Sequence, residues 1–191
     1  MIDLFDAAKE LQDFCDRQGW RSCFIGGIAV QRWGEPRVTR DLDLTLLAGF
    51  GNEGRFTGAL LTAYEARIEE AATFAQRNRV LLLRTSTGIG IDISLGALPF
   101  EERMIERATT FAPTPGLNIR TCSAEDLIVT KLFASRPTDI RDAESVAARH
   151  GTTLDWNYID DQLRPFAEIE GGHDILASLA RLRRLPEARD R

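Results

Sequence analysis

The sequence predicts a mixed α/β fold, in which a small mixed β-sheet with flanking helices is followed by a purely helical part. Short β-rich segments alternate with amphipathic helical segments up to about Thr121, and helical patterns alone follow it. A chain of 191 residues buries roughly 70% of the surface that it exposes when unfolded, so a hydrophobic core is available without metal or disulfide. We therefore expect an α/β core over residues 1–121 and a helical region over residues 122–191.

The first elements follow from apolar spacing and from helix-ending residues. Apolar residues at helical spacing predict a helix over residues 2–17, which Gly19 ends. Residues 23–25 form a short apolar run typical of a buried strand, and residues 29–33 predict a short helix that Gly34 and Pro36 stop.

The middle of the chain alternates between strand and helix patterns. Residues 39–47 alternate polar and apolar side chains, which predicts a strand. Residues 56–74 read as helical, either as one helix or as a broken one, and the β-rich runs 80–85 and 91–95 enclose a glycine-containing turn typical of a hairpin. A short helix is expected over 100–107 and a strand over 117–121.

The last third predicts four helices. Ser123 and Asp126 resemble a capping box that opens a helix over residues 124–134. Further helices are expected over residues 138–150, 156–169 and 174–185.

Composition excludes some functions and favours a location. A net charge of −5 argues against a protein that coats nucleic acid non-specifically, which needs a basic surface, and leaves a small basic groove open. The apolar runs are too short to span a bilayer, and the N-terminus lacks the basic segment of a signal peptide. We therefore expect no membrane partner. Cys15, Cys23 and Cys122 lack metal-ligand spacing, so we expect buried free thiols and a cytoplasmic location.

Three aspartates are candidates for a metal site. Asp41 and Asp43 point to one side of their strand, and Asp92 lies at the centre of another predicted strand. Two carboxylates about 5 Å apart repel by roughly 3 kcal/mol at an effective dielectric of about 20, so a cluster of three favours a bound cation. Oxygen ligands of this kind suit Mg²⁺ or Mn²⁺. For the isolated Asp-x-Asp pattern, an amphipathic strand with a solvated face is the alternative.

Gly26 and Gly27 lie between a predicted strand and a predicted helix. Backbone N–H groups at such a helix start can hold a phosphate. Close packing of the strand against the helix is the alternative reading of the same two glycines.

These motifs, in this order, resemble the nucleotidyltransferase superfamily with the polymerase-β-like fold. The closest resemblance is to the AbiEii-type toxin branch, whose segment reads approximately RxTxDLDL and which carries a later Lys-Leu motif followed by Arg and Asp residues. The residues that match are Gly26, Gly27, Arg37, Thr39, Asp41, Asp43, Asp92, Lys131, Arg136, Asp139 and Asp142. The resemblance covers roughly residues 23–146, and its motifs are specific only as an ordered set. Many family members have Ser after the first glycine, where this chain has Gly27.

The resemblance implies roles for these residues. Catalysis and metal binding fall to Asp41, Asp43 and Asp92, and the helical region is expected to complete the active-site cleft. Nucleotide binding is implied for Gly26, Gly27, Arg37, Thr39, Lys131 and Asp142. Arg37 is preferred to Arg40 as a phosphate ligand, because Arg40 falls on the strand face opposite Asp41.

The second motif also has structural readings. Lys131 lies among apolar residues of a predicted helix, where a lysine often extends its amine to solvent. Arg136 and Asp139 lie on either side of Pro137 and can pair to shape the bend between two helices.

The expected function is a Mg²⁺-dependent transfer of a nucleoside monophosphate from an NTP to an acceptor hydroxyl, with release of pyrophosphate. The toxin branch implies a tRNA end or a protein as acceptor and a cognate antitoxin as partner. A small-molecule antibiotic is the alternative acceptor, and a non-catalytic nucleotide-binding or antitoxin module of the same fold is an alternative class. A glycosyltransferase that uses the Asp-x-Asp pattern is a weaker alternative, because a Gly-Gly turn before that pattern is not typical of glycosyltransferases.

Overall fold

The computed structural model describes residues 4–168 and 173–185. The chain groups into two compact units, which we call the sheet unit and the helical unit. The sheet unit comprises Met1–Ile28 and Val38–Cys122, and the helical unit comprises Ala29–Arg37 and Ser123–Arg191. The expected division into domains 1–121 and 122–191 stays a prediction.

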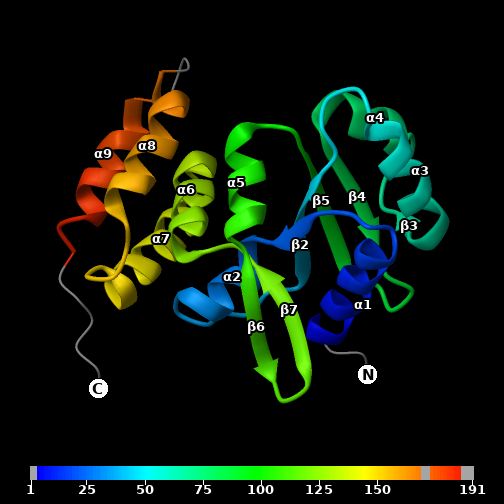
Figure 1. Ribbon diagram of the computed structural model, residues 1–191, viewed down its shortest axis with the longest axis horizontal. Helices are drawn as coiled ribbons and strands as arrows, with labels where there is room; N and C mark the ends of the chain where they lie inside the picture. Colours follow the sequence, from blue (N-terminus) through cyan, green and yellow to red (C-terminus); the bar gives the residue numbers. More distant parts are fainter. Residues whose placement is uncertain (1–3, 169–172, 186–191) are drawn as a thin grey trace. The chain divides into compact units, whose positions relative to one another are not determined.

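The sheet unit contains a seven-stranded mixed sheet (Figure 1). Its strands are β1 (Ser22–Phe24), β2 (Asp41–Leu47), β3 (Glu65–Ala66), β4 (Val80–Arg84), β5 (Gly90–Gly96), β6 (Thr109–Thr114) and β7 (Leu117–Thr121). They lie in the order β3-β4-β5-β2-β1-β7-β6. The pairs β5–β2 and β1–β7 are parallel, and the other neighbours are antiparallel. The predicted mixed α/β fold is confirmed.

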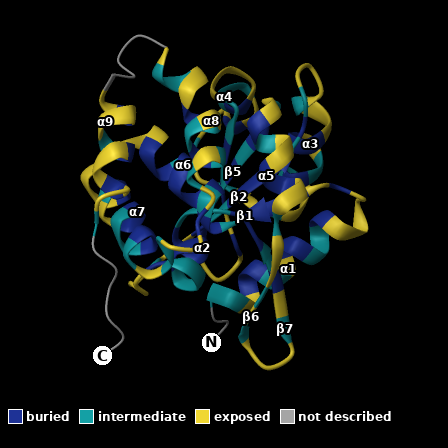
Figure 2. Cartoon of the chain, turned by 60° about the vertical axis from the view of Figure 1, so that its left-hand side comes forward, coloured by how far each residue is buried: buried dark blue, intermediate teal, exposed yellow. Residues whose placement is uncertain are grey.

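Helices cover the sheet and enclose its core. They are α1 (Leu4–Arg17), α3 (Glu53–Ala63), α4 (Ala71–Asn78) and α5 (Pro99–Arg107). α1 contacts β7, β1 and β2, whereas α4 contacts α3 and β4, and α5 contacts β2. The strands β1, β2 and β5 are largely buried (Figure 2). The apolar face of β2 contributes Leu42, Leu44 and Leu46 to the core, as its alternation predicts.

Two segments of the sheet unit differ from the sequence prediction. Residues 56–74 are not one helix, because the chain leaves α3 at Tyr64 and pairs as β3 with β4. Pairing with a neighbouring strand has overridden a weak local helix pattern here. Strand β6, which contains Pro113, was not expected. It lies at the sheet edge and is irregular between Phe111 and Thr114, where a proline is tolerated.

The helical unit is built from α6 (Ala124–Ala134), α7 (Pro137–His150), α8 (Trp156–Ala167) and α9 (His173–Leu182). α6 contacts the other three. The side chain of Ser123 accepts a hydrogen bond from Asp126 N, so the predicted N-cap is confirmed. The fully buried Asp126 accepts from Tyr158 Oη at 2.6 Å, which ties α8 to α6. The helix expected over residues 156–169 corresponds to α8, and its predicted end at residue 169 lies outside the described residues.

Helix α2 (Gly26–Trp33) starts three residues before the predicted helix and passes from the sheet unit into the helical unit. Cys15, Cys23 and Cys122 are buried free thiols, as expected; the cytoplasmic location stays a prediction. None of the helices in the described ranges has the length and apolar character needed to cross a membrane.

Candidate active site

The Gly-Gly turn lies directly against the first acidic strand. Gly26 has a φ of +53°, a conformation that favours glycine, and a Cβ on it would overlap the carboxylate of Asp43. A Cβ on Gly27 would overlap the hydroxyl of Thr39. The backbone N–H of Gly27 donates a long hydrogen bond, 3.4 Å, to Asp43 Oδ2. Close packing of the turn is therefore observed, and phosphate binding by its N–H groups stays a prediction.

Strand pairing brings the three predicted acids side by side. β2 and β5 are parallel neighbours, and in their register Asp43 lies opposite Asp92. Asp41 lies opposite Gly90, where a Cβ would overlap the Asp41 carboxylate. Asp41 and Asp43 thus lie on the polar face of β2, opposite its buried leucines and beside Asp92 of β5.

Arg67 forms an ion pair with Asp92, so a positive charge lies beside the three acids. The guanidinium of Arg67 donates to Asp92 Oδ1, and the two side chains are 30% and 39% exposed. Partial burial raises the pKa of Asp92; the positive charge of Arg67 opposes this rise, and the negative charge of Asp41 adds to it. Arg67 follows the two-residue strand β3 and belongs to no recognisable motif, so this contact could not be predicted from the sequence.

The donor set of this cluster suits a hard divalent cation, since it consists of carboxylates on adjacent strands. However, no group of three or more His, Cys, Asp or Glu side chains within the described ranges is gathered closely enough to hold a metal ion. The residues fit the chemistry of Mg²⁺ or Mn²⁺, and their side chains would have to converge to bind one.

The remaining predicted residues meet in the helical unit, as a network of ion pairs. Lys131 is buried, and its Nζ lies 2.8 Å from Asp139 Oδ1 and 2.8 Å from Asp142 Oδ2. Arg37 donates twice to Asp142, through Nε at 2.8 Å and Nη2 at 2.9 Å. Arg136 donates to Asp139 across Pro137, as one of the sequence readings expected. Lys131 does not extend to solvent; two buried carboxylates hold its amine.

These contacts keep both aspartates ionised. Burial acts to raise the pKa of Asp142, but hydrogen bonds from Arg37 and Lys131 outweigh it and lower the pKa below its usual value. The pKa of Asp139 is lowered in the same way, against its burial, by Arg136 and Lys131. The network therefore carries fixed charges of both signs at neutral pH.

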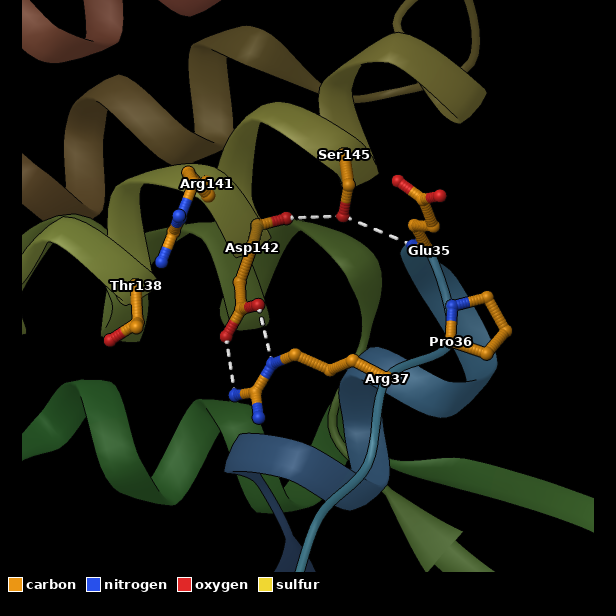
Figure 3. A pocket seen from close by; sticks show the side chains of 7 residues that line it. All are labelled: Glu35, Pro36, Arg37, Thr138, Arg141, Asp142 and Ser145. Carbon is orange, nitrogen blue, oxygen red and sulfur yellow. Dashed lines mark hydrogen bonds and ion pairs between the residues drawn. The ribbon is translucent and has the colours of Figure 1, made fainter.

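A cavity of about 280 Å³ opens beside this network (Figure 3). It is lined by Glu35, Pro36, Arg37, Thr138, Arg141, Asp142 and Ser145. Ser145 Oγ accepts from the backbone N–H of Glu35 at 3.1 Å and donates to the carbonyl of Asp142 at 2.7 Å. In Figure 3 the Arg37 guanidinium faces the Asp142 carboxylate inside this cavity.

The predicted residues thus fall into two groups, one in each unit. The sheet unit holds Gly26, Gly27, Thr39, Asp41, Asp43 and Asp92, and the helical unit holds Arg37, Lys131 and Asp142. Sequence reasoning missed Arg67 in the first group. In the second, it recognised Arg136 and Asp139 as a pair and did not foresee that Lys131 joins them.

Comparison with solved structures supports the fold. A crystal structure of an antigenic nucleotidyltransferase-like protein from Paracoccidioides brasiliensis matches with a TM-score of 0.52 and 17% identity, over 93% of this chain and 92% of that one. The solution structure of the antibiotic-resistance factor ANT(2'')-Ia matches with a TM-score of 0.54 and 14% identity, over 93% of this chain and 94% of that one. At these identities the likeness shows a shared fold. No curated protein matches the sequence at a significant level.

The family comparison covers nearly the whole chain. The model of the nucleotidyl transferase AbiEii toxin family, of type IV toxin–antitoxin systems, matches residues 14–185. That range includes every residue of both groups described above. The chain therefore belongs to the AbiEii family of nucleotidyltransferase toxins.

Proposed function

We propose that this nucleotidyltransferase moves a nucleoside monophosphate from an NTP to a hydroxyl acceptor on RNA or protein, with Mg²⁺ or Mn²⁺ held by Asp41, Asp43 and Asp92. The observation that carries the proposal is the register of β2 and β5, which places Asp43 opposite Asp92, with Asp41 two residues before Asp43 on the same face of β2. All three acids are present, and Asp43 lies against the Gly-Gly turn, which argues against a non-catalytic module of the same fold.

In the proposed reaction, the acceptor oxygen attacks the α-phosphorus and the bond to pyrophosphate breaks. Asp41, Asp43 and Asp92 are proposed to hold the cation, and Asp92 also to help accept the hydroxyl proton. A bound divalent cation would stabilise negative charge on the attacking and leaving oxygens. The N–H of Gly27 and the hydroxyl of Thr39, which packs against Gly27, are proposed to orient phosphate oxygens.

In the helical unit, we assign the phosphate-contacting role to Arg37 and a positioning role to Lys131. The Arg37 side chain is 44% exposed and opens onto the cavity, whereas that of Lys131 is 7% exposed and already contacts two carboxylates. Lys131 fixes Asp142, and Asp142 in turn holds the Arg37 guanidinium by two hydrogen bonds. Asp142 is thus proposed to act on the nucleotide through Arg37.

A small-molecule acceptor is the second candidate. ANT(2'')-Ia, which shares the fold, is described as an antibiotic-resistance factor. The toxin family to which the chain belongs favours a macromolecular acceptor, and the family description also supports a cognate antitoxin as a genetic partner.

The experiment that tests the proposal is incubation with each of the four labelled NTPs, Mg²⁺ and total cellular RNA and protein, beside a parallel reaction with small hydroxylated antibiotics. We expect label in the RNA or the protein fraction, and none when EDTA is present. Label only in the antibiotic reaction would replace the proposed acceptor. Absence of label from every fraction with every NTP would contradict the proposed activity.

A further inference from the structure

The register of the sheet unit aligns Arg67 with the acid cluster. Ala66 pairs with Leu83, and the backbone N–H of Arg67 then donates to Leu82 O at 3.0 Å, which continues the β3–β4 ladder by one residue. Leu82 lies opposite Asp92 on β5, and Asp92 lies opposite Asp43 on β2. Arg67, Leu82, Asp92 and Asp43 therefore form one row across four neighbouring strands, and aligned residues share a face of a sheet.

The Arg67 side chain reaches along this row into the cluster. Two strand spacings separate β3 from β5, roughly 10 Å, which an extended arginine can largely cross. It passes Leu82 and donates to Asp92. A Cβ placed on Gly90 would overlap Asp41 Oδ1 and lie 3.1 Å from Arg67 Nη1, so the Asp41 carboxylate and the guanidinium flank the same point.

Closer acids do not explain this choice of partner. Glu69 and Glu70 lie two and three residues further along the chain, and both are exposed. Arg84, on the neighbouring strand, pairs instead with the exposed Glu65 at the sheet edge. Arg67 alone among these arginines turns inward, toward carboxylates that are partly buried and mutually repulsive.

We propose that Arg67 is a resident cation of the acid cluster, which it neutralises in the metal-free protein and must leave when a divalent metal binds. The side chains of the described residues are not gathered for a metal in this state, and the Asp92 oxygen that a metal needs is engaged by the guanidinium. Displacing Arg67 would release Asp92 to turn toward Asp43 and Asp41. The proposal rests on the proposed function in taking these acids as the metal ligands.

Two consequences follow for metal binding. The metal has to compete with a positive charge tethered beside its site, so its affinity for the free protein is reduced. Loss of the Arg67 charge should therefore tighten metal binding, while loss of an ordinary surface arginine should not.

Calorimetry with Mn²⁺ on the full chain, without nucleotide, tests the proposal. Arg67→Gln keeps most of the side-chain length and removes the charge, and we expect it to bind Mn²⁺ about fivefold more tightly than the parent, as for removal of one half-exposed ion pair. Arg67→Lys should stay within about twofold of the parent, because the charge remains. Arg120→Gln is the matched control, because it removes an arginine of similar exposure that pairs with Asp16 and lies on β7, which β1 separates from β2; we expect no change.

Thermal melts provide a second readout. With EDTA, Arg67→Gln should melt below the parent, because the carboxylates lose their counter-charge, and saturating Mn²⁺ should raise its melting temperature by more than it raises that of the parent. Equal Mn²⁺ affinities for the parent and Arg67→Gln, or weaker binding by Arg67→Gln, would overturn the proposal. These measurements do not depend on nucleotide transfer. If the parent transfers nucleotide but binds Mn²⁺ with the same affinity as Arg67→Gln, the role of Arg67 is refuted and the proposed function stands.

Discussion

Gly26 shows how closely the turn and the first acidic strand constrain each other. A methyl group there would meet both a positive φ and the Asp43 carboxylate. We expect Gly26→Ala to destabilise the protein by about 1–3 kcal/mol, because both the backbone conformation and the position of Asp43 must change. Denaturant unfolding measures the change.

The matched control lies in α3. Gly58 is in the helix interior, and a Cβ on it would meet no atom within 4 Å. Gly58→Ala should stabilise by up to about 1 kcal/mol. If Gly26→Ala were as well tolerated as Gly58→Ala, the close approach of the turn to Asp43 would be refuted.

Lys131 carries a second residue-level prediction, because it neutralises two buried carboxylates. Lys131→Met should destabilise by about 3 kcal/mol, since Asp139 and Asp142 remain buried with one cation fewer. Lys9→Met, which removes a half-exposed pair with Asp13, should cost less than about 1 kcal/mol. Urea unfolding measures the loss of stability in both variants. Equal losses would mean that the Lys131 network contributes no more to stability than a surface ion pair.

The same network predicts a pH dependence. The pKa values of Asp139 and Asp142 are lower in the folded protein than in the unfolded chain, so the unfolded chain takes up protons first as the pH falls. The stability that they contribute is complete above the usual aspartate pKa of about 4 and is lost as the pH drops below it. Melting temperatures between pH 3 and pH 7 should therefore fall less steeply for Asp139→Asn/Asp142→Asn than for the parent. Parallel profiles would contradict the lowered pKa values.

At the scale of elements, the hydrogen bond from Tyr158 to Asp126 joins α8 to α6. Tyr158→Phe should cost about 1–3 kcal/mol, because it removes a donor from a fully buried carboxylate. Tyr64→Phe is the matched control, since the part-buried Tyr64 hydroxyl has no hydrogen-bond partner among the described residues, and we expect it to be nearly neutral. Thermal melts of the two variants measure the difference, and a neutral Tyr158→Phe would mean that other contacts hold α8.

The elements also show what the sequence could and could not predict. The alternation over 39–47 and the hairpin over 80–95 were readable because one face of each strand is buried. The two-residue β3 and the edge strand β6 were not, because pairing with a neighbour, rather than their own residues, makes them strands. Arg67 was missed for the same reason, since only the pairing of β3 with β4 aligns it with Asp92.

The ordered motifs carried the prediction at the scale of the whole molecule. Each motif has a structural alternative when taken alone: the glycine turn, the paired aspartates, the third acid and the later lysine. Together they indicated the family, which the match over residues 14–185 confirms. The buried position of Lys131 could not be foreseen, because it depends on Asp139 and Asp142 folding back from α7 onto α6. The acceptor could not be predicted either, because no sequence motif identifies it.

The central claim is that Asp43 holds a cation for nucleotide transfer, and the Asp43→Asn protein tests it most directly. Transfer from a labelled NTP in Mg²⁺ is measured beside thermal melts in EDTA, with the half-exposed Asp13 on α1 changed to Asn as the control. We predict that Asp43→Asn abolishes transfer, while the metal-free protein stays as stable as the parent or becomes more stable, because one of three neighbouring negative charges is removed. Asp13→Asn should transfer as the parent does. Full transfer by Asp43→Asn would contradict the account, and loss of transfer with a large loss of metal-free stability would assign Asp43 to the structure instead.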